Sequence, residues 1–115
     1  MKKVYFATPV NGRSEGSIRE KKIAALRRCI KMREALTRKH PDWAVMFSFN
    51  VCPIDANLSE PEAMGRCVTL LMACDMIVVD NGWEGSKGCQ AEVKVADTYG
   101  IPVLSVLQLF MANEL

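Results

Sequence analysis

The clearest indication of the fold is the sequence DMIVVDNGWEGSKGCQAEVKVADTYGIPV at residues 75–103. It opens with a short β-branched apolar run at residues 76–79, which is typical of a strand buried on both faces. A glycine-rich turn follows, and then a helical pattern that continues to Tyr99. Gly100 ends this helix, and residues 101–103 begin another strand. These elements form half of a doubly wound α/β unit, whose ligands bind beyond the carboxyl ends of the strands, where the glycine-rich turn lies.

Glu92 breaks the pattern of the helix in this stretch. Its helical face is otherwise small and apolar, as expected of a face packed on a sheet, and is shared with Gly88, Val95, Ala96 and Tyr99. A buried unpaired charge is costly, so Glu92 needs a partner, a raised pKa or a cavity. An ionised carboxylate at the mouth of a sheet suits covalent catalysis at a sugar carbon. The spacing equally allows Glu92 to lie at the edge of the face and meet solvent or Lys87.

The composition predicts one compact domain over residues 1–115 in a cytoplasmic protein. Five cysteines without a CxxC pair indicate reduced thiols that serve in packing. The single histidine, His40, cannot anchor a zinc site, so we expect neither a metal nor a cofactor. The apolar run near the start is too short for a secretory segment and predicts a strand. No stretch is long and apolar enough to span a membrane, so no membrane partner is expected.

Charge is distributed unevenly along the chain. Twelve of the fifteen Lys and Arg residues fall within residues 1–40, and ten of the thirteen Asp and Glu residues fall within residues 41–115. A basic surface can attract nucleic acid. The basic residues nevertheless lie largely on one amphipathic helix without interleaved aromatic residues, which favours a solvated helix face. Nucleic acid is therefore not an expected partner.

Strands and helices alternate along the whole chain. The pattern predicts strands at residues 3–8, 43–50, 76–79 and 102–107, helices at 18–38, 60–74 and 87–99, and a short helix or arm at 108–115. Ser17 and Ser59, each with a glutamate three residues on, mark the starts of the first two helices. We expect Ile18, Ala25, Leu26, Cys29, Met32 and Leu36 to face inward from the first helix, and Met64, Cys67, Val68 and Leu71 from the second. This order predicts a three-layer, Rossmann- or flavodoxin-like α/β fold, in which helices cover both faces of a parallel sheet of four or five strands.

Two loops are expected to meet at the carboxyl edge of the sheet. One follows the first strand and the other occupies residues 81–88. Ser86, Lys87 and Gly88 precede a helix, so their backbone N–H groups can face an anion. Alternatively, the glycines only permit a tight turn and close helix packing. The candidate binding residues are Thr8, Pro9, Asn11 and Gly12 in the first loop, and Gly82, Ser86, Lys87 and Gly88 in the second.

Three further side chains are candidates for chemistry. Trp83 in the glycine-rich turn can stack on a base or sugar, although a tryptophan folded back on the core is equally common. Asp80, at the end of a strand, can bind a ribose hydroxyl or act as an acid; otherwise it caps a helix or loop. Tyr5 lies within the first strand, where a tyrosine is more often part of the core.

These motifs resemble the nucleoside 2-deoxyribosyltransferase superfamily. The similarity lies in VYFATPVNG at 4–12, LLMACD at 70–75 and MIVVDNGWEGSKGCQAEVKVADTYGIPV at 76–103. It is closest to a small branch with the motif GWxxSxGxxxE, related to deoxynucleoside 5′-monophosphate N-glycosidases. The resemblance implies a Rossmann-like sheet, a nucleoside or nucleotide pocket and Glu92 as the nucleophile at the anomeric carbon. It also implies that Ser86 binds a 5′-phosphate, that residues 9–12 line the pocket, and that Tyr5 contacts the glutamate or the sugar.

Cys67 departs from the pattern of this superfamily. Active members carry an aspartate at this position, where it contacts the base and helps it to leave. A thiol is a much weaker acid, with an unperturbed pKa of ~8.5. Either Asp80 or Glu84 takes over the role, the leaving base needs no proton, or the chain is not a fast glycosidase.

The leading hypothesis is an enzyme that cleaves or transfers the N-glycosidic bond of a (deoxy)nucleoside or its 5′-monophosphate through Glu92. The alternatives are a nucleotide-binding module without turnover and a small assembly partner with a vestigial pocket. Because so short a chain closes a pocket poorly, we expect a homodimer or higher homo-oligomer, in which residues 109–115 of a neighbouring copy form one wall.

Overall fold

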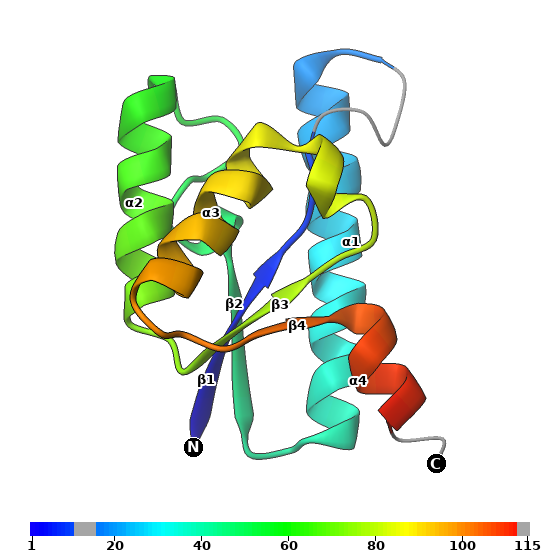
Figure 1. The fold of residues 1–115 in the computed structure, drawn as a ribbon. Coiled ribbons are helices and arrows are strands. Elements are labelled where there is room, and N and C mark those ends of the chain that lie inside the picture. The colour runs from blue at the N-terminus through cyan, green and yellow to red at the C-terminus, as the bar shows by residue number, and fades with distance from the viewer. Residues whose placement is uncertain (11–15, 113–115) are drawn as a thin grey trace.

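The computed structural model describes residues 1–10 and 16–112. Its centre is a sheet of four strands in the order β2-β1-β3-β4, and every neighbouring pair is parallel (Figure 1). Each connection between successive strands contains a helix. The strands are β1 (Lys2–Ala7), β2 (Trp43–Phe47), β3 (Met76–Val79) and β4 (Val103–Ser105).

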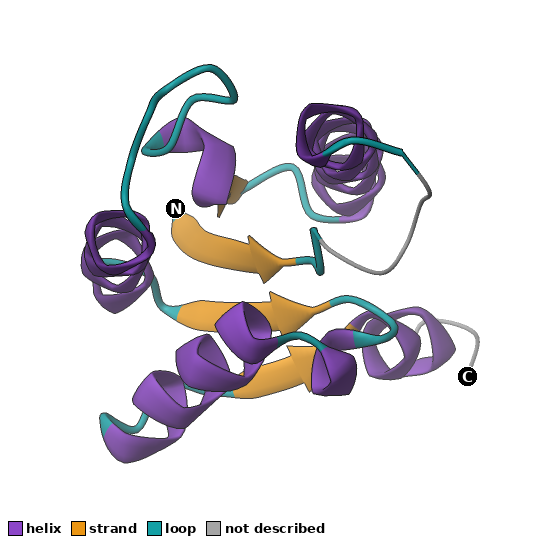
Figure 2. Cartoon of the chain, turned by 90° about the horizontal axis from the view of Figure 1, so that it is seen from above, coloured by secondary structure: helices purple, strands orange, loops and turns teal. Residues whose placement is uncertain are grey.

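Helices cover both faces of this sheet, so the predicted three-layer α/β fold is confirmed (Figure 2). One face packs against α1 and α4, and the other packs against α2 and α3. Two single-turn 3₁₀ helices, η1 and η2, follow β2 and β3. The helices are α1 (Ile18–Lys39), η1 (Ser48–Asn50), α2 (Glu60–Met72), η2 (Trp83–Gly85), α3 (Lys87–Thr98) and α4 (Val106–Ala112).

The alternation of side chains along the central strands separates two apolar clusters. Along β3, Met76 and Val78 face α1, whereas Ile77 and Val79 face α2 and α3. β1 alternates in the same way, because it is paired in register with β3. The β3 residues are all buried, which explains why the apolar run is continuous.

The helix boundaries follow the capping signals in the sequence. Ser17 caps α1 in a full capping box with Glu20, and Ser59 accepts a hydrogen bond from the N–H of Glu62 at the start of α2. Gly100 follows α3 with a φ of 72°, a left-handed conformation that favours glycine. These three predicted boundaries are confirmed.

Two strands are shorter than the sequence pattern suggests. The second strand ends at Phe47 rather than residue 50, because Asn50 Oδ1 accepts the N–H of Phe47 at 2.8 Å and turns the chain into η1. The fourth strand ends at Ser105 rather than residue 107. There, Ser105 and Gln108 exchange side-chain to backbone hydrogen bonds of 3.0 and 2.8 Å, which start α4.

Some residues expected on inner faces lie in solvent. Ile18 is 67% exposed at the start of α1, and Tyr99 is 64% exposed just after α3. Ile18 is the first residue of α1, and Tyr99 is the C-cap of α3. Leu109 and Phe110, expected to line a neighbouring copy, pack against the chain's own core. Among the described helices, none has both the length and the apolar character needed to cross a bilayer.

Candidate active site around Glu92

Glu92 lies on the inner face of α3 between Cys89 and Ala96, and only 6% of its surface is exposed. Its Oε2 atom has no hydrogen-bond partner among the described residues. The alternative in which Glu92 meets solvent or Lys87 is therefore wrong, because Lys87 is exposed and the carboxyl group is buried. An orphaned polar atom in a native interior is rare, so its presence needs an explanation.

Burial changes the acidity of this carboxyl group. Removal from water raises the pKa of Glu92 to about 7, while a hydrogen bond with the side chain of Tyr5 acts in the opposite direction. Burial and the neighbouring Glu92 together raise the pKa of Tyr5 well above its ordinary value, so its hydroxyl stays protonated. Near neutral pH, Glu92 therefore exchanges readily between a carboxylate and a carboxylic acid.

Cys67 is the third member of this cluster and comes from α2. Its side chain interacts with both Tyr5 and Glu92, and burial raises the pKa of its thiol to about 12. Thus β1, α2 and α3 each bring one side chain to the same place. The position that the resemblance singled out as a departure lies beside the proposed nucleophile, and it holds a neutral thiol there.

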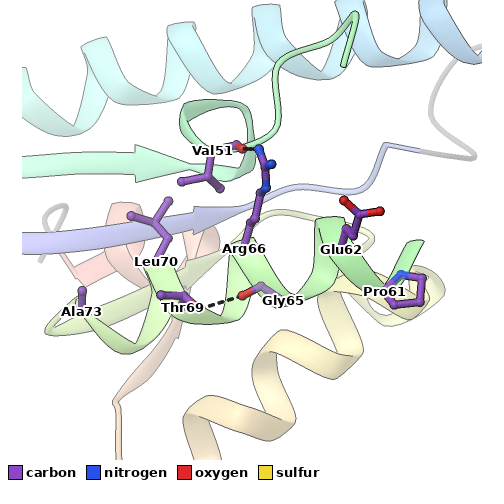
Figure 3. A pocket seen from close by; sticks show the side chains of 8 residues that line it. All are labelled: Val51, Pro61, Glu62, Gly65, Arg66, Thr69, Leu70 and Ala73. Carbon is purple, nitrogen blue, oxygen red and sulfur yellow. Dashed lines mark hydrogen bonds between the residues drawn. The ribbon is translucent and has the colours of Figure 1, made fainter. Parts of the chain in front are cut away.

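A cavity of about 190 Å³ lies next to this cluster on the side of Cys67. Its wall is mainly apolar, with Lys22 as its one charged side chain among the described residues, and includes Val10, Phe49, Cys52, Leu58 and Cys67. A larger hollow, of about 800 Å³, lies along the outer side of α2 (Figure 3), and Glu92 lines neither of these two hollows. Size alone therefore does not locate the chemistry.

Asp80 does not belong to the Glu92 cluster. It follows Val79 by one residue and so points to the opposite face of the sheet, towards α1. There, Nε and Nη2 of Arg28 bind its two oxygens at 2.9 and 2.8 Å, and Thr8 Oγ1 donates to Oδ2 at 2.8 Å. Asp80 is fully buried and held as an anion by the guanidinium. The interpretation of Asp80 as the acid that protonates the leaving base is corrected accordingly, because this carboxylate ties β1, β3 and α1 together.

The ends of β1 and β3, after which the two predicted loops begin, lie side by side at the carboxyl edge of the sheet. The N–H of Asp80 donates to the carbonyl of Ala7 at 2.9 Å, and the hydroxyl of Thr8 reaches the Asp80 carboxylate. Thr8 is therefore occupied with Asp80, and Pro9 beside it is buried. Asn11 and Gly12 lie outside the described residues.

Ser86 begins α3 and shapes the second loop. Its Oγ accepts the N–H of Cys89 at 3.3 Å, so Ser86 is the N-cap, and Lys87 begins the helix in solvent. A side chain at Gly88 would make only ordinary contacts, 3.8 Å from Met64. Close packing therefore does not require a glycine there. Gly82 differs, because its φ of 85° makes a left-handed turn that favours glycine.

Trp83 lies on a different side of α3 from Glu92. It is half-buried, packs on the α2–α3 side of the core, and lines a groove of about 470 Å³. The groove is formed with outward residues of α3, among them Gln90, Lys94 and Asp97. In this arrangement the indole is folded onto the core, the second of the two alternatives, and does not cover Glu92.

Arg28 and Cys52 are the two site residues that the sequence alone does not reveal. Arg28 lies one residue before the buried Cys29, at the flank of the apolar stripe of α1, among many exposed basic residues. A buried strand-end aspartate that needs a cation is the signal that could have found it. Cys52 lies in the loop after η1, with its Sγ 3.9 Å from that of Cys67. In the described chain, no three His, Cys, Asp or Glu side chains are grouped to hold a metal.

The fold and this cluster define a small parallel α/β protein with a buried glutamate beside a tyrosine, and one oxygen of this glutamate has no hydrogen-bond partner among the described residues. The chain belongs to the family described as "Domain of unknown function (DUF4406)", which matches residues 2–105. It is also similar to a crystal structure of a conserved protein from Enterococcus faecalis V583, with a TM-score of 0.69 and 21% identity over 91% of this chain. The chain covers 62% of that protein, and this likeness shows the fold alone. No curated protein matches the chain.

Proposed function

We propose that the chain cleaves or exchanges the N-glycosidic bond of a nucleoside or a nucleoside 5′-monophosphate, with Glu92 as the nucleophile. The observation that carries the proposal is the buried Glu92 carboxyl group, whose Oε2 has no partner among the described residues. Such a group costs stability, so a chemical role accounts for it better than packing does. The resemblance to the nucleoside 2-deoxyribosyltransferase superfamily, and the cavity beside Cys67, support the same assignment.

In the proposed reaction, the ionised Oε2 of Glu92 attacks C1′ of the sugar. The bond to the base breaks, and the base leaves with the bonding electrons. Tyr5, through its hydrogen bond to the carboxyl group, orients Glu92 for this attack. Water or a second base then takes the sugar from the glycosyl-enzyme. Ser86 and the first turn of α3 are the proposed contacts for a 5′-phosphate or 5′-hydroxyl.

The leaving base is the demanding part of this scheme. Asp80 faces the other side of the sheet, and the pKa of the Cys67 thiol, about 12, makes it a poor proton donor. General acid help typically contributes 10²–10⁴-fold in rate. The proposal therefore favours substrates whose base departs without prior protonation, and it predicts slow release of bases that need a proton.

A base-release assay on the purified chain tests the proposal. Ribo- and deoxyribonucleosides and their 5′-monophosphates are supplied with and without an acceptor base, and Glu92→Gln is the matched control. Free base from the parent chain and none from the variant is the expected result. Equal release from both proteins would exclude Glu92 as the nucleophile.

Size-exclusion chromatography with light scattering tests the proposed homo-oligomer in the same preparation.

A nucleotide-binding module without turnover is the second candidate, and Cys67 favours it. A neutral thiol beside Glu92 leaves a pocket that can hold a base without helping it to depart. Saturable nucleotide binding by calorimetry, with no base released over hours, would select this function. In that case, Glu92→Gln is expected to keep most of the binding.

A further inference from the structure

Two cysteines from separate segments meet beside the Glu92 cluster. Cys67 lies within α2 and is 7% exposed, whereas Cys52 lies in the loop after η1 and is half-buried. Their sulfur atoms are 3.9 Å apart, and both line the 190 Å³ cavity. Of the five cysteines, all in the described part of the chain, Cys52 is the one that is not buried. An oxidant can therefore reach this pair through Cys52.

The loop that carries Cys52 is fastened to α2 at two points. Arg66 extends from α2, and its Nη1 donates to the carbonyl of Val51 at 3.0 Å (Figure 3). The thiol of Cys52 is directed at the carbonyl of Ala63, with its Sγ 3.6 Å from that oxygen. Val51 immediately precedes Cys52, so the guanidinium of Arg66 sets the position of the loop against the helix. These two contacts hold the sulfurs of Cys52 and Cys67 close together.

We propose that Cys52 and Cys67 are a redox modification site, at which a peroxide converts the two thiols into a reversible disulfide. The Cys52 thiolate attacks one oxygen of hydrogen peroxide, the O–O bond breaks, and the departing hydroxide becomes water. Cys52 is then a sulfenic acid. The sulfur of Cys67 attacks it, and its proton leaves with the hydroxyl group as a second water. The two sulfurs lose two electrons in total, and the peroxide gains them.

The geometry suits this bond. A disulfide needs its sulfurs about 2 Å apart, so they must approach by roughly that distance from their present contact. Cys52 supplies this movement, because it lies in a loop, whereas Cys67 is fixed in the middle of α2. The contact also replaces a bimolecular encounter with one inside the chain. The second step is thereby favoured even though the buried thiol has a raised pKa of about 12.

Oxidation would change the surroundings of Glu92. In the reduced chain, the thiol of Cys67 interacts with both Tyr5 and Glu92. A disulfide removes its S–H and brings Cys52 against it, in the wall of the cavity that both residues line. The bond couples the redox state to the cluster whether or not Glu92 is catalytic. Only an effect on base release rests on the proposed function.

The test uses the full chain, treated with increasing hydrogen peroxide, then alkylated and mapped by peptide mass spectrometry. The expected product is one cross-linked peptide pair joining Cys52 to Cys67, with two hydrogens lost, and dithiothreitol restores both thiols. Cys52→Ala is expected to abolish the product. Cys74→Ser is the matched control, because a hydroxyl can keep the bond to the Leu70 carbonyl, and it is expected to leave the product unchanged.

Arg66→Met tests the fastening of the loop. Loss of its hydrogen bond to Val51 is expected to slow disulfide formation about fivefold, the factor that corresponds to one typical hydrogen bond, while circular dichroism stays that of the parent. Sulfinic acid at Cys52 with a free thiol at Cys67 would overturn the proposal. So would cross-links of other pairs, or no bridge at peroxide levels that oxidise a simple thiol.

Discussion

Asp80 and Glu92 are two buried carboxyl groups on opposite faces of one small sheet, and they differ in what surrounds them. Both oxygens of Asp80 are bound by Arg28, with further donors from Thr8 and the N–H of Asn81. Glu92 has a tyrosine beside it and an oxygen without a partner among the described residues. Burial alone therefore does not identify a reactive carboxylate. Pairing makes one group structural and leaves the other available for chemistry.

Removing Arg28 from its ion pair with Asp80 is expected to have the largest effect on stability. Arg28→Met leaves the Asp80 charge buried without its cation, which should lower the free energy of unfolding by about 3–5 kcal/mol. Urea denaturation at pH 7 measures this loss. Arg27→Met, at the exposed neighbouring position, is the control and should change stability by less than ~0.5 kcal/mol. Adding Asp80→Asn to Arg28→Met should recover part of the loss; no recovery would mean that the charge is not the cause.

The contribution of Glu92 to the free energy of unfolding should change with pH in the opposite direction from that of a paired carboxylate. Its folded-state pKa of about 7 lies above the ordinary value of 4.5, so between these values the folded chain keeps a proton that the unfolded chain has lost. The free energy of unfolding should therefore fall as pH rises through this window, by about 3 kcal/mol in total. Glu92→Gln should abolish this pH-dependent loss of stability. The variant should be more stable than the parent at pH 8, with little difference at pH 4. Parallel stability curves for the two proteins would contradict the assignment.

Tyr5→Phe removes a hydroxyl that favours the ionised form of Glu92. The pKa of Glu92 should rise further, because a hydrogen bond to a charged group is typically worth about 1.5 kcal/mol or more. Carbon-detected NMR of the Glu92 carboxyl group across pH 5–9 measures the titration directly. The Tyr5→Phe, Glu92→Gln double variant is the control, since it should lack that titration. An unchanged midpoint would show that the hydroxyl does not act on Glu92.

Thr8→Val should have the smallest effect. It removes one of several donors to Asp80 while Arg28 remains, so we expect a loss of about 1 kcal/mol that does not vary between pH 6 and 8. Thermal unfolding measures it. Thr69→Val, whose hydroxyl bonds to a helix carbonyl in solvent, is the control and should cost less. Equal losses would show that the Asp80 network does not depend on Thr8.

Local patterns were sufficient to predict most of the fold. The continuous apolar run at 76–79 identified the central strand, and serine caps identified the starts of α1 and α2. The errors lie at boundaries, where a side chain competes for a backbone group. Asn50 and Gln108 each take an N–H that would otherwise extend a strand. Such bonds depend on conformation rather than on periodicity.

A site residue could be predicted when its signal lies within one helix or strand of the sequence. Glu92 stood out because one carboxylate interrupts an apolar helical face. Asp80 was misassigned because the sequence does not show that Arg28, 52 residues away, binds both of its oxygens. Arg28 and Cys52 were missed because each contacts a residue in a different element of the fold. The pattern of a single sequence does not reveal such contacts.

The central position of β1 has a consequence for synthesis of the chain. β1 is made before the other three strands of the sheet, yet it pairs with β2 from Lys2↔Trp43 and with β3 from Val4↔Met76. While a ribosome is still making the middle of the chain, β1 can pair with β2 on one edge, but its other edge remains open until β3 has emerged. That edge can pair with the strands of other chains. A nascent chain halted before residue 76 should therefore need a chaperone, whereas the folded sheet covers both edges of β1 with β2 and β3.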